Sequence, residues 1–172
     1  MTITAATTSS PRDFDFWFGT WRGQNRRLRE RLAGCEEWDE FEGRCVARPM
    51  LDGFANVEEF TTDFAGGFVG MAVRVFDPET RLWAIYWADS RMPGLLEAPM
   101  IGSFSDGVGI FECEELFGGR PITVRFTWSD ITETSARWAQ SFSGDGGATW
   151  ETNWTTLHTR SSGRLWARPR RL

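Results

Sequence analysis

Apolar and polar residues alternate with a period of two along most of the chain, and Gly, Pro and Asp turns interrupt the alternation at roughly every tenth residue. This pattern is typical of β-strands that bury one face, and no long window carries apolar residues at helical spacing. The predicted strands span residues 16–25, 37–47, 54–61, 68–76, 82–88, 100–104, 109–116, 122–128, 135–143 and 149–159.

Ten strands in a chain of 172 residues are too many for a flat sheet with exposed edges, so closure into a barrel is favoured. We therefore predict an all-β fold, a single antiparallel up-and-down β-barrel of about ten strands. The barrel domain is expected at 13–160, between a disordered leader at 1–12 and a flexible basic tail at 161–172. Gly43 is predicted to form a β-bulge within the second strand.

The composition points to an aromatic interior and a particular kind of cation. The chain has 14 Phe and 10 Trp but one Tyr, and flat rings suit strands and pocket walls. All 19 basic residues are arginine, which excludes lysine-based nucleophiles and leaves a cation suited to carboxylate or phosphate. Solvated surface is expected for two arginine groups, with recruitment of an acidic partner as the alternative; these are Arg22, Arg26, Arg27, Arg29 and Arg31, and Arg164, Arg168, Arg170 and Arg171.

Several partners and locations are disfavoured by the sequence. The net charge of −5 argues against a nucleic-acid surface, and no apolar run reaches the length of a membrane span. The three cysteines lack C-x-x-C spacing, so we expect no disulfide framework, no metal site and a reduced, cytoplasmic location. A small molecule is the expected partner, and a homodimer is left open.

A signature near the start of the chain resembles a known family. The segment from Asp13 to Trp21, Asp-Phe-Asp-Phe-Trp-Phe-Gly-Thr-Trp, resembles the FDFW-x-G-x-W opening of a group of uncharacterised bacterial lipocalin-like (calycin) proteins. This resemblance implies a calycin barrel in which Gly19 and Trp21 close one end and Arg160 packs over the tryptophan as a cation–π lid. It implies no particular ligand, because such barrels have unrelated functions.

A more distant likeness concerns haem. The run from Gly19 to Gly23, Gly-Thr-Trp-Arg-Gly, is similar to the opening of the nitrobindins, which bind haem through a histidine near the C-terminus. His158 is the sole histidine and would be the axial ligand under that likeness, although the rest of the nitrobindin pattern is absent. Our leading expectation is no cofactor, with haem as an alternative.

The main hypothesis for function is a small-molecule-binding barrel. Its aromatic-lined cavity would hold a largely apolar ligand with an anionic or carbonyl end, gripped by Arg, Asn or Gln. An inward arginine could hold a carboxylate, while an outward one would be solvated. The candidate ligand-binding residues are Asn56, Arg74, Tyr86, Trp87, Arg125, Trp138, Gln140, Asn153 and Trp154.

An acid/base enzyme on the same barrel, such as a cyclase, isomerase or dehydratase, is the alternative. Its candidate catalytic residues are Glu58, Asp89 and His158. Glu58 lies between aromatic positions, where its pKa could be raised, but a buried ion pair with an arginine is equally compatible with this pattern.

One further motif, Ser143-x-Asp145-x-Gly147-x-Thr149-Trp150, fits the Asp-box pattern of sialidase propellers. A single copy cannot make a propeller, so we expect it to stabilise a hairpin turn.

Overall fold

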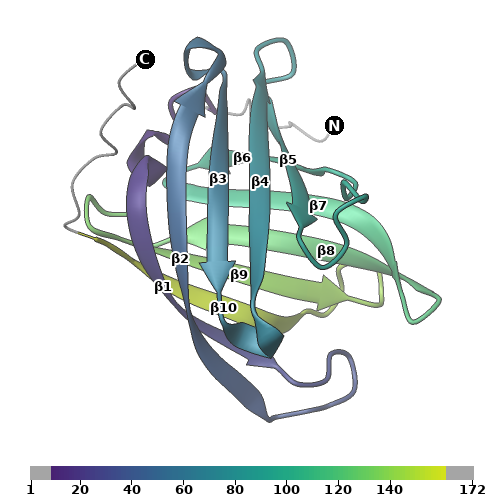
Figure 1. The fold of residues 1–172 in the computed structure, drawn as a ribbon. Coiled ribbons are helices and arrows are strands. Elements are labelled where there is room, and N and C mark those ends of the chain that lie inside the picture. Colours follow the sequence, from purple (N-terminus) through teal and green to yellow (C-terminus); the bar gives the residue numbers. More distant parts are fainter. Residues whose placement is uncertain (1–8, 162–172) are drawn as a thin grey trace, which may run out of the picture.

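The computed structural model describes residues 9–161, which form one closed barrel of ten antiparallel strands (Figure 1). Each strand pairs with the next in sequence, and β1 pairs with β10 to close the barrel. The predicted fold class is therefore confirmed, whereas the expectations for residues 1–8 and 162–172 lie outside the described residues. The strands are β1 (Gly19–Leu28), β2 (Trp38–Met50), β3 (Ala55–Thr62), β4 (Phe68–Asp77), β5 (Leu82–Asp89), β6 (Met100–Ser105), β7 (Val108–Phe117), β8 (Arg120–Ser129), β9 (Ser135–Ser143) and β10 (Glu151–Arg160).

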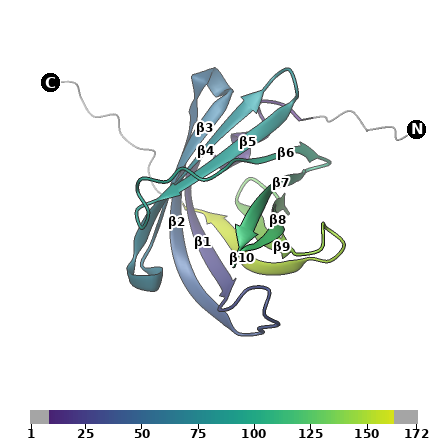
Figure 2. The ribbon, with the colours of Figure 1, turned by 90° about the vertical axis from the view of Figure 1, so that its right-hand side faces the viewer.

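The wall bends so that its two halves cross. Figure 1 shows β1–β5 running nearly upright, with β6–β10 passing behind them at a steep angle, and Figure 2 shows the same wall from the side. Three short 3₁₀ helices, η1 (Asp15–Trp17), η2 (Leu51–Gly53) and η3 (Phe64–Gly66), occur outside the strands of the described chain. Because side chains alternate along each strand, every second residue points into the barrel.

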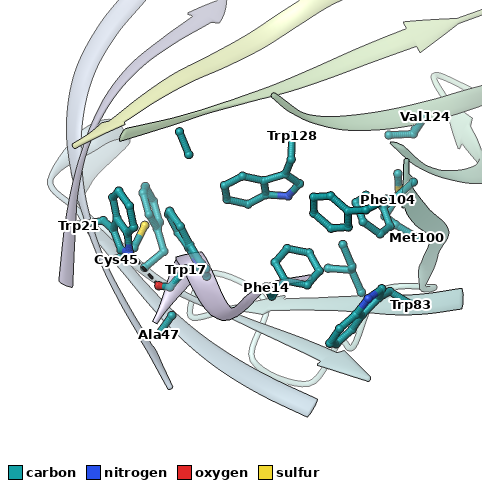
Figure 3. Close-up of a cluster of buried hydrophobic side chains, with 14 of the residues drawn as sticks. Phe14, Trp17, Trp21, Cys45, Ala47, Trp83, Met100, Phe104, Val124 and Trp128 are labelled. Atoms are coloured by element: carbon teal, nitrogen blue, oxygen red, sulfur yellow. Dashed lines mark hydrogen bonds between the residues drawn. The ribbon is translucent and has the colours of Figure 1, made fainter. Parts of the chain in front are cut away.

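One end of the barrel is sealed by the segment that leads into β1. This segment includes η1, where the sequence pattern predicted the start of a strand, and its Phe14 and Trp17 are fully buried (Figure 3). Trp21 Nε1 donates a 2.8 Å hydrogen bond to the carbonyl of Trp17, and Trp83 Nε1 donates one of 3.2 Å to Asp13. Ser9, the first described residue, is buried. We call the end of the barrel that Phe14 and Trp17 close the sealed end, and the opposite end the open end.

The expected lid is present at the sealed end. The guanidinium carbon of Arg160 lies 4.2 Å from the centre of the buried Trp21 ring. The same guanidinium donates hydrogen bonds of 2.7 Å to the carbonyls of Phe18 and Glu133. Arg160 thus ties the last strand to the sealing segment.

The predicted bulge at Gly43 is wrong, because Gly43 pairs in register with Gly23. Gly43 instead leaves room for a ring: a Cβ built there would lie 2.3 Å from Phe60 Cε2. The register shift occurs in β10, between Thr152 and Trp154, and places Asn153 at an irregularity in the wall.

The Asp-box residues form the turn between β9 and β10. Asp145 accepts hydrogen bonds from the backbone N–H and the hydroxyl of Thr149, at 2.9 and 2.6 Å. Trp150 Nε1 donates to the carbonyl of Gly147 at 3.1 Å, and Arg125 lies 3.7 Å from the centre of the Trp150 ring. These contacts agree with the expected folding role. In the described part of the chain, no helix has the length and apolar character needed to cross a membrane.

Candidate functional site

The interior of the barrel changes character from the sealed end to the open end. At the sealed end the inward side chains are fully buried, whereas the open half combines buried inward residues, such as Phe68 and Phe142, with rings that keep partial exposure. Partly exposed rings of this kind offer flat apolar surface for contact with a small molecule. These rings belong to Phe41, Phe64, Trp87, Phe117, Phe126, Trp138 and Trp154.

One row of side chains crosses four neighbouring strands in the open half. Arg27 on β1 pairs with Trp154 on β10, Trp154 pairs with Gln140 on β9, and Gln140 pairs with Phe126 on β8. The next row toward the sealed end contains Trp138, whose ring packs edge-on against Trp154 at 5.8 Å and lies 5.0 Å from Phe126. An aromatic wall is thereby interrupted by one cation and one amide.

The polar groups of this wall are arranged by a small hydrogen-bond network. Asn25 Oδ1 accepts hydrogen bonds from Trp154 Nε1 at 3.0 Å and from Thr156 Oγ1 at 2.7 Å, which fixes the indole ring. Gln140 Nε2 donates to Asn153 Oδ1 at 2.9 Å. The Oε1 atom of Gln140 accepts no hydrogen bond from a described residue and is free to bind a ligand donor.

Arg27 is the most unusual charge in the open half. Its guanidinium carbon lies 4.9 Å from the centre of the Trp154 ring, and no described carboxylate comes within ion-pair distance of it. Its Nε is buried without a hydrogen-bond partner. Burial, together with repulsion from Arg31 and Arg91, lowers the pKa of Arg27 to about 10. An unpaired, partly desolvated guanidinium is a group that an anion would stabilise.

Some predicted ligand-binding residues line this open half. Trp138, Gln140 and Trp154 are inward members of the two rows, and Asn153 orients Gln140 from the bulge. Trp87 also faces inward, because a Cβ at Gly70 would lie 2.1 Å from its ring.

Two predicted ligand-binding residues point away from the interior. Tyr86 pairs with Val73 on the outer face, out of phase with the inward Trp87. Arg125 lies on the outer wall, where it donates a 2.6 Å hydrogen bond to Glu112 and covers the Trp150 ring. Strand alternation had left the inward face of both strands undecided.

Two other candidates, Asn56 and Arg74, face inward but lie at the sealed end together with Glu58. Arg74 forms a buried ion pair with Glu58 and donates a 3.0 Å hydrogen bond to Asn56 Oδ1. Trp17 Nε1 donates to the same Glu58 carboxylate at 2.9 Å. Burial alone would raise the pKa of Glu58, but the charge and hydrogen bond of Arg74 hold this pKa below its ordinary value. Of the two alternatives that the sequence left open for Glu58, a raised pKa and a buried ion pair with an arginine, the structure has the ion pair.

His158 is buried in the same region. Its ring stacks on Trp128 at 5.6 Å and meets Trp17 edge-on at 4.6 Å, while its Nδ1 faces the wall at Gly23 and has no hydrogen-bond partner. Burial lowers the pKa of His158 to about 4. An axial haem ligand needs a nitrogen that opens onto space for the porphyrin, and the rings packed around His158 do not fit that requirement.

Asp89 lies at the open end of β5, but its carboxylate is engaged. Arg91 donates to it from Nε at 3.0 Å and from a terminal nitrogen at 2.6 Å, and Trp87 Nε1 donates at 3.4 Å. The hydrogen bonds of Arg91 lower the pKa of Asp89 to about 2. Among the described residues, no group of His, Cys, Asp or Glu is arranged to hold a metal ion.

An outer groove of about 720 Å³ lies along β1 and β2 beside Arg22 and Glu42 and reaches the turn between β3 and β4. Arg22 and Glu42 form an ion pair with each other.

Sequence reasoning missed Asn25, Arg27, Arg31 and Arg91. Arg27 and Arg31 were grouped with solvated surface arginines. The alternation of β1 held the missing signal, because Trp21, Gly23, Asn25 and Arg27 share one face and Trp21 was already assigned to the interior.

Comparison with known proteins finds similar solved structures but no matching sequence family. No protein-family model matches the chain, and no curated protein matches it. The chain is similar to the S-type phycobiliprotein lyase CPES from Guillardia theta, with a TM-score of 0.59 and 11% identity over 88% of this chain and 92% of that one. It is also similar to Rv2717c from M. tuberculosis, with a TM-score of 0.56 and 12% identity over 89% of this chain and 99% of that one.

The fold is calycin-like. At such low identity these likenesses concern the fold alone. Membership of the bacterial lipocalin-like group stays a prediction.

Proposed function

We propose that the open half of the barrel binds a small, largely apolar molecule with an anionic or carbonyl end, and that Arg27 holds this end. The observation that carries the proposal is the half-buried guanidinium of Arg27, which faces the interior without a carboxylate partner. A folded chain rarely leaves a partly buried charge unpaired unless a ligand completes the pairing.

The surroundings of Arg27 fit such a ligand. The rings of Trp138, Trp154 and Phe126 offer flat apolar contact, and the free Oε1 of Gln140 offers one acceptor beside them. The similar barrel from Guillardia theta belongs to a protein named as a phycobiliprotein lyase, which is consistent with a barrel that takes a small molecule. Few polar groups among many apolar ones are typical of small-molecule sites.

The acid/base alternative has less support. The pKa values of Asp89 and His158 lie at about 2 and 4, and that of Glu58 is lowered. A general acid or base works best when its pKa is near the working pH. Binding therefore accounts for the interior better than proton transfer does.

Titration with the fluorescent anion 8-anilinonaphthalene-1-sulfonate tests the proposal. The wild-type protein is expected to bind this probe, and Arg27→Gln should weaken binding about tenfold, since one charge-assisted contact is worth on the order of 1.4 kcal/mol or more. Arg26→Gln is the matched control, because Arg26 lies next in the same strand, points outward and pairs with Glu40.

A neutral analogue, N-phenyl-1-naphthylamine, separates charge from shape. Its affinity should be the same in wild-type and Arg27→Gln protein. Equal affinities of the wild-type and Arg27→Gln proteins for the anionic probe would refute the role of Arg27. If neither probe bound to the wild-type protein, the binding site itself would be refuted.

A further inference from the structure

Three arginines gather at the open end, each over an aromatic ring. Besides Arg27 on Trp154, the guanidinium carbon of Arg31 lies 5.2 Å from the centre of the Phe117 ring and 5.7 Å from that of Phe142. The guanidinium carbon of Arg91 lies 3.8 Å from the centre of the Phe68 ring. Arg27 and Arg31 cover neighbouring parts of the wall, because Trp154 pairs with Gln140, which lies two residues from Phe142 on the same face of β9. The charges of Arg31 and Arg91 also lower the pKa of Arg27.

The pairing of these arginines differs from that of the outward arginines nearby. On and just after β1, the outward Arg22, Arg26 and Arg29 each form an ion pair with a carboxylate of β2 or of the segment before it. Arg27 and Arg31 have no described carboxylate within ion-pair distance. The acidic β2 strand therefore neutralises the outer face of β1 and leaves its inner end positive.

The nearest carboxylates are held by other groups. Asp39 lies opposite Arg27 in the β1–β2 register, and its charge raises the pKa of Arg27, but it accepts a 2.8 Å hydrogen bond from Arg29 and forms its ion pair there. Asp89 is held by Arg91 through two side-chain hydrogen bonds. Glu151, whose charge reaches Arg31, accepts hydrogen bonds from the backbone N–H of Leu32 at both carboxylate oxygens, at 2.8 and 3.0 Å. Two guanidinium charges, those of Arg27 and Arg31, are left without an ion-pair partner.

The carboxyl group of Glu97 forms no ion pair with a described arginine. It lies on the exposed segment between β5 and β6, where desolvation and the charges of Glu115 and Asp89 raise its pKa, while the charge of Arg91 lowers it.

We infer that the ligand's anionic end is a dianion, with two negative charges on neighbouring oxygens, as in a phosphate monoester or two adjacent carboxylates. Arg27 and Arg31 each take one charge, and the already paired Arg91 adds a longer-range attraction. This inference rests on the proposed function and narrows its ligand class. The planar, permanently charged guanidinium is well suited to either kind of oxygen pair.

Matched aromatic probes test the charge requirement by isothermal titration calorimetry. 1-Naphthyl phosphate is nearly isosteric with 1-naphthyl sulfate but carries two charges at pH 8, since the second phosphate pKa is about 6. The phosphate is expected to bind about tenfold tighter than the sulfate at pH 8 and low salt, equivalent to one additional charge contact. At pH 5 this preference should vanish.

Variants of Arg31 and Arg26 test whether Arg27 and Arg31 cause the preference for the dianionic probe. Arg31→Gln should remove most of the preference for the dianion while the sulfate still binds through Arg27, and Arg26→Gln should leave the preference intact. A second pair of probes, naphthalene-2,3-dicarboxylate and 2-naphthoate, distinguishes adjacent carboxylates from a phosphate. The pair with the larger ratio of dianion affinity to monoanion affinity identifies the headgroup. A larger ratio in either pair supports the inference.

Equal affinity for the sulfate and the phosphate, together with equal affinity for the two carboxylates, would overturn the dianion inference and leave the proposed function standing. Retention of the dianion preference in Arg31→Gln would also overturn it. Failure of every probe to bind would instead contradict the proposed function itself.

Discussion

Arg27 and Trp154 lie opposite each other across the β1–β10 pair, with the guanidinium carbon 4.9 Å from the centre of the indole ring. The indole is itself fixed by the hydrogen bond from its Nε1 to Asn25. The cation therefore rests on a rigid aromatic surface inside the barrel, and its remaining donors are available to a ligand. The predictions below follow from this arrangement and from the buried network at the sealed end.

Arg27→Gln should leave the protein as stable as the wild type or more stable, by up to about 1 kcal/mol, because it removes a partly desolvated charge that lacks a partner. Urea denaturation of the ligand-free protein measures this difference. A loss of more than about 1 kcal/mol would indicate that Arg27 is a structural residue.

The Glu58–Arg74 pair should behave as one unit. Arg74→Met or Glu58→Leu alone should cost about 3–5 kcal/mol, because each leaves the other charge buried and unpaired. The double variant should cost clearly less than the sum of the two single changes. Additive losses in a denaturation cycle would argue against the buried pair.

Stability should fall as the pH drops from 6.5 to 4. His158 has its pKa lowered by burial to about 4, so the unfolded chain takes up a proton that the folded protein refuses in this window. The full loss amounts to about 3 kcal/mol below pH 4. Asp89 and Glu58, whose pKa values are lowered, add to the loss at still lower pH, as they protonate in the unfolded state first.

The control for this pH dependence is His158→Gln. In this variant, the stability measured by urea denaturation should be nearly flat between pH 6.5 and 5. An unchanged slope would show that another group is responsible.

Gly70→Ala should disturb the aromatic wall. The new Cβ would lie 2.1 Å from the Trp87 ring, so the ring must move, at a cost of about 1–3 kcal/mol. Gly144→Ala is the matched control, since no heavy atom lies within 4 Å of its Cβ position. Thermal unfolding of both variants makes the comparison, and equal melting temperatures would mean that Trp87 does not lie against Gly70.

The fold could be predicted from the sequence because alternation and turn residues are local signals. The hairpin from Phe68 to Asp89 was expected at 68–76 and 82–88, and β9 at 135–143, within a residue of the observed strands. The closure of one end at Trp21 was expected, but the 3₁₀ helix before it was missed, since Phe16 and Phe18 alternate as in a strand while Asp15–Trp17 forms a 3₁₀ helix. The conformation of this short sealing segment depends on the contacts of Phe14 and Trp17 with distant strands.

The candidate site was less predictable, because alternation states which residues share a face but does not say which face points inward. Trp154 and Gln140 were found through their aromatic context, while Tyr86 and Arg125 lie on the outer face. Arg27 was overlooked because its neighbours in sequence are also arginines. Alternation counted from the interior Trp21 separates the inward Arg27 from the outward Arg26, which forms an ion pair with Glu40 of β2.

The position of a bound probe decides whether the open half of the barrel is a ligand site. A crystal structure of the protein grown with 8-anilinonaphthalene-1-sulfonate should show the naphthalene ring against Trp138 and Trp154, with the sulfonate within hydrogen-bond distance of the Arg27 guanidinium. Density for the probe on the outer wall beside Arg22 and Glu42, with the barrel interior unchanged, would contradict the assignment.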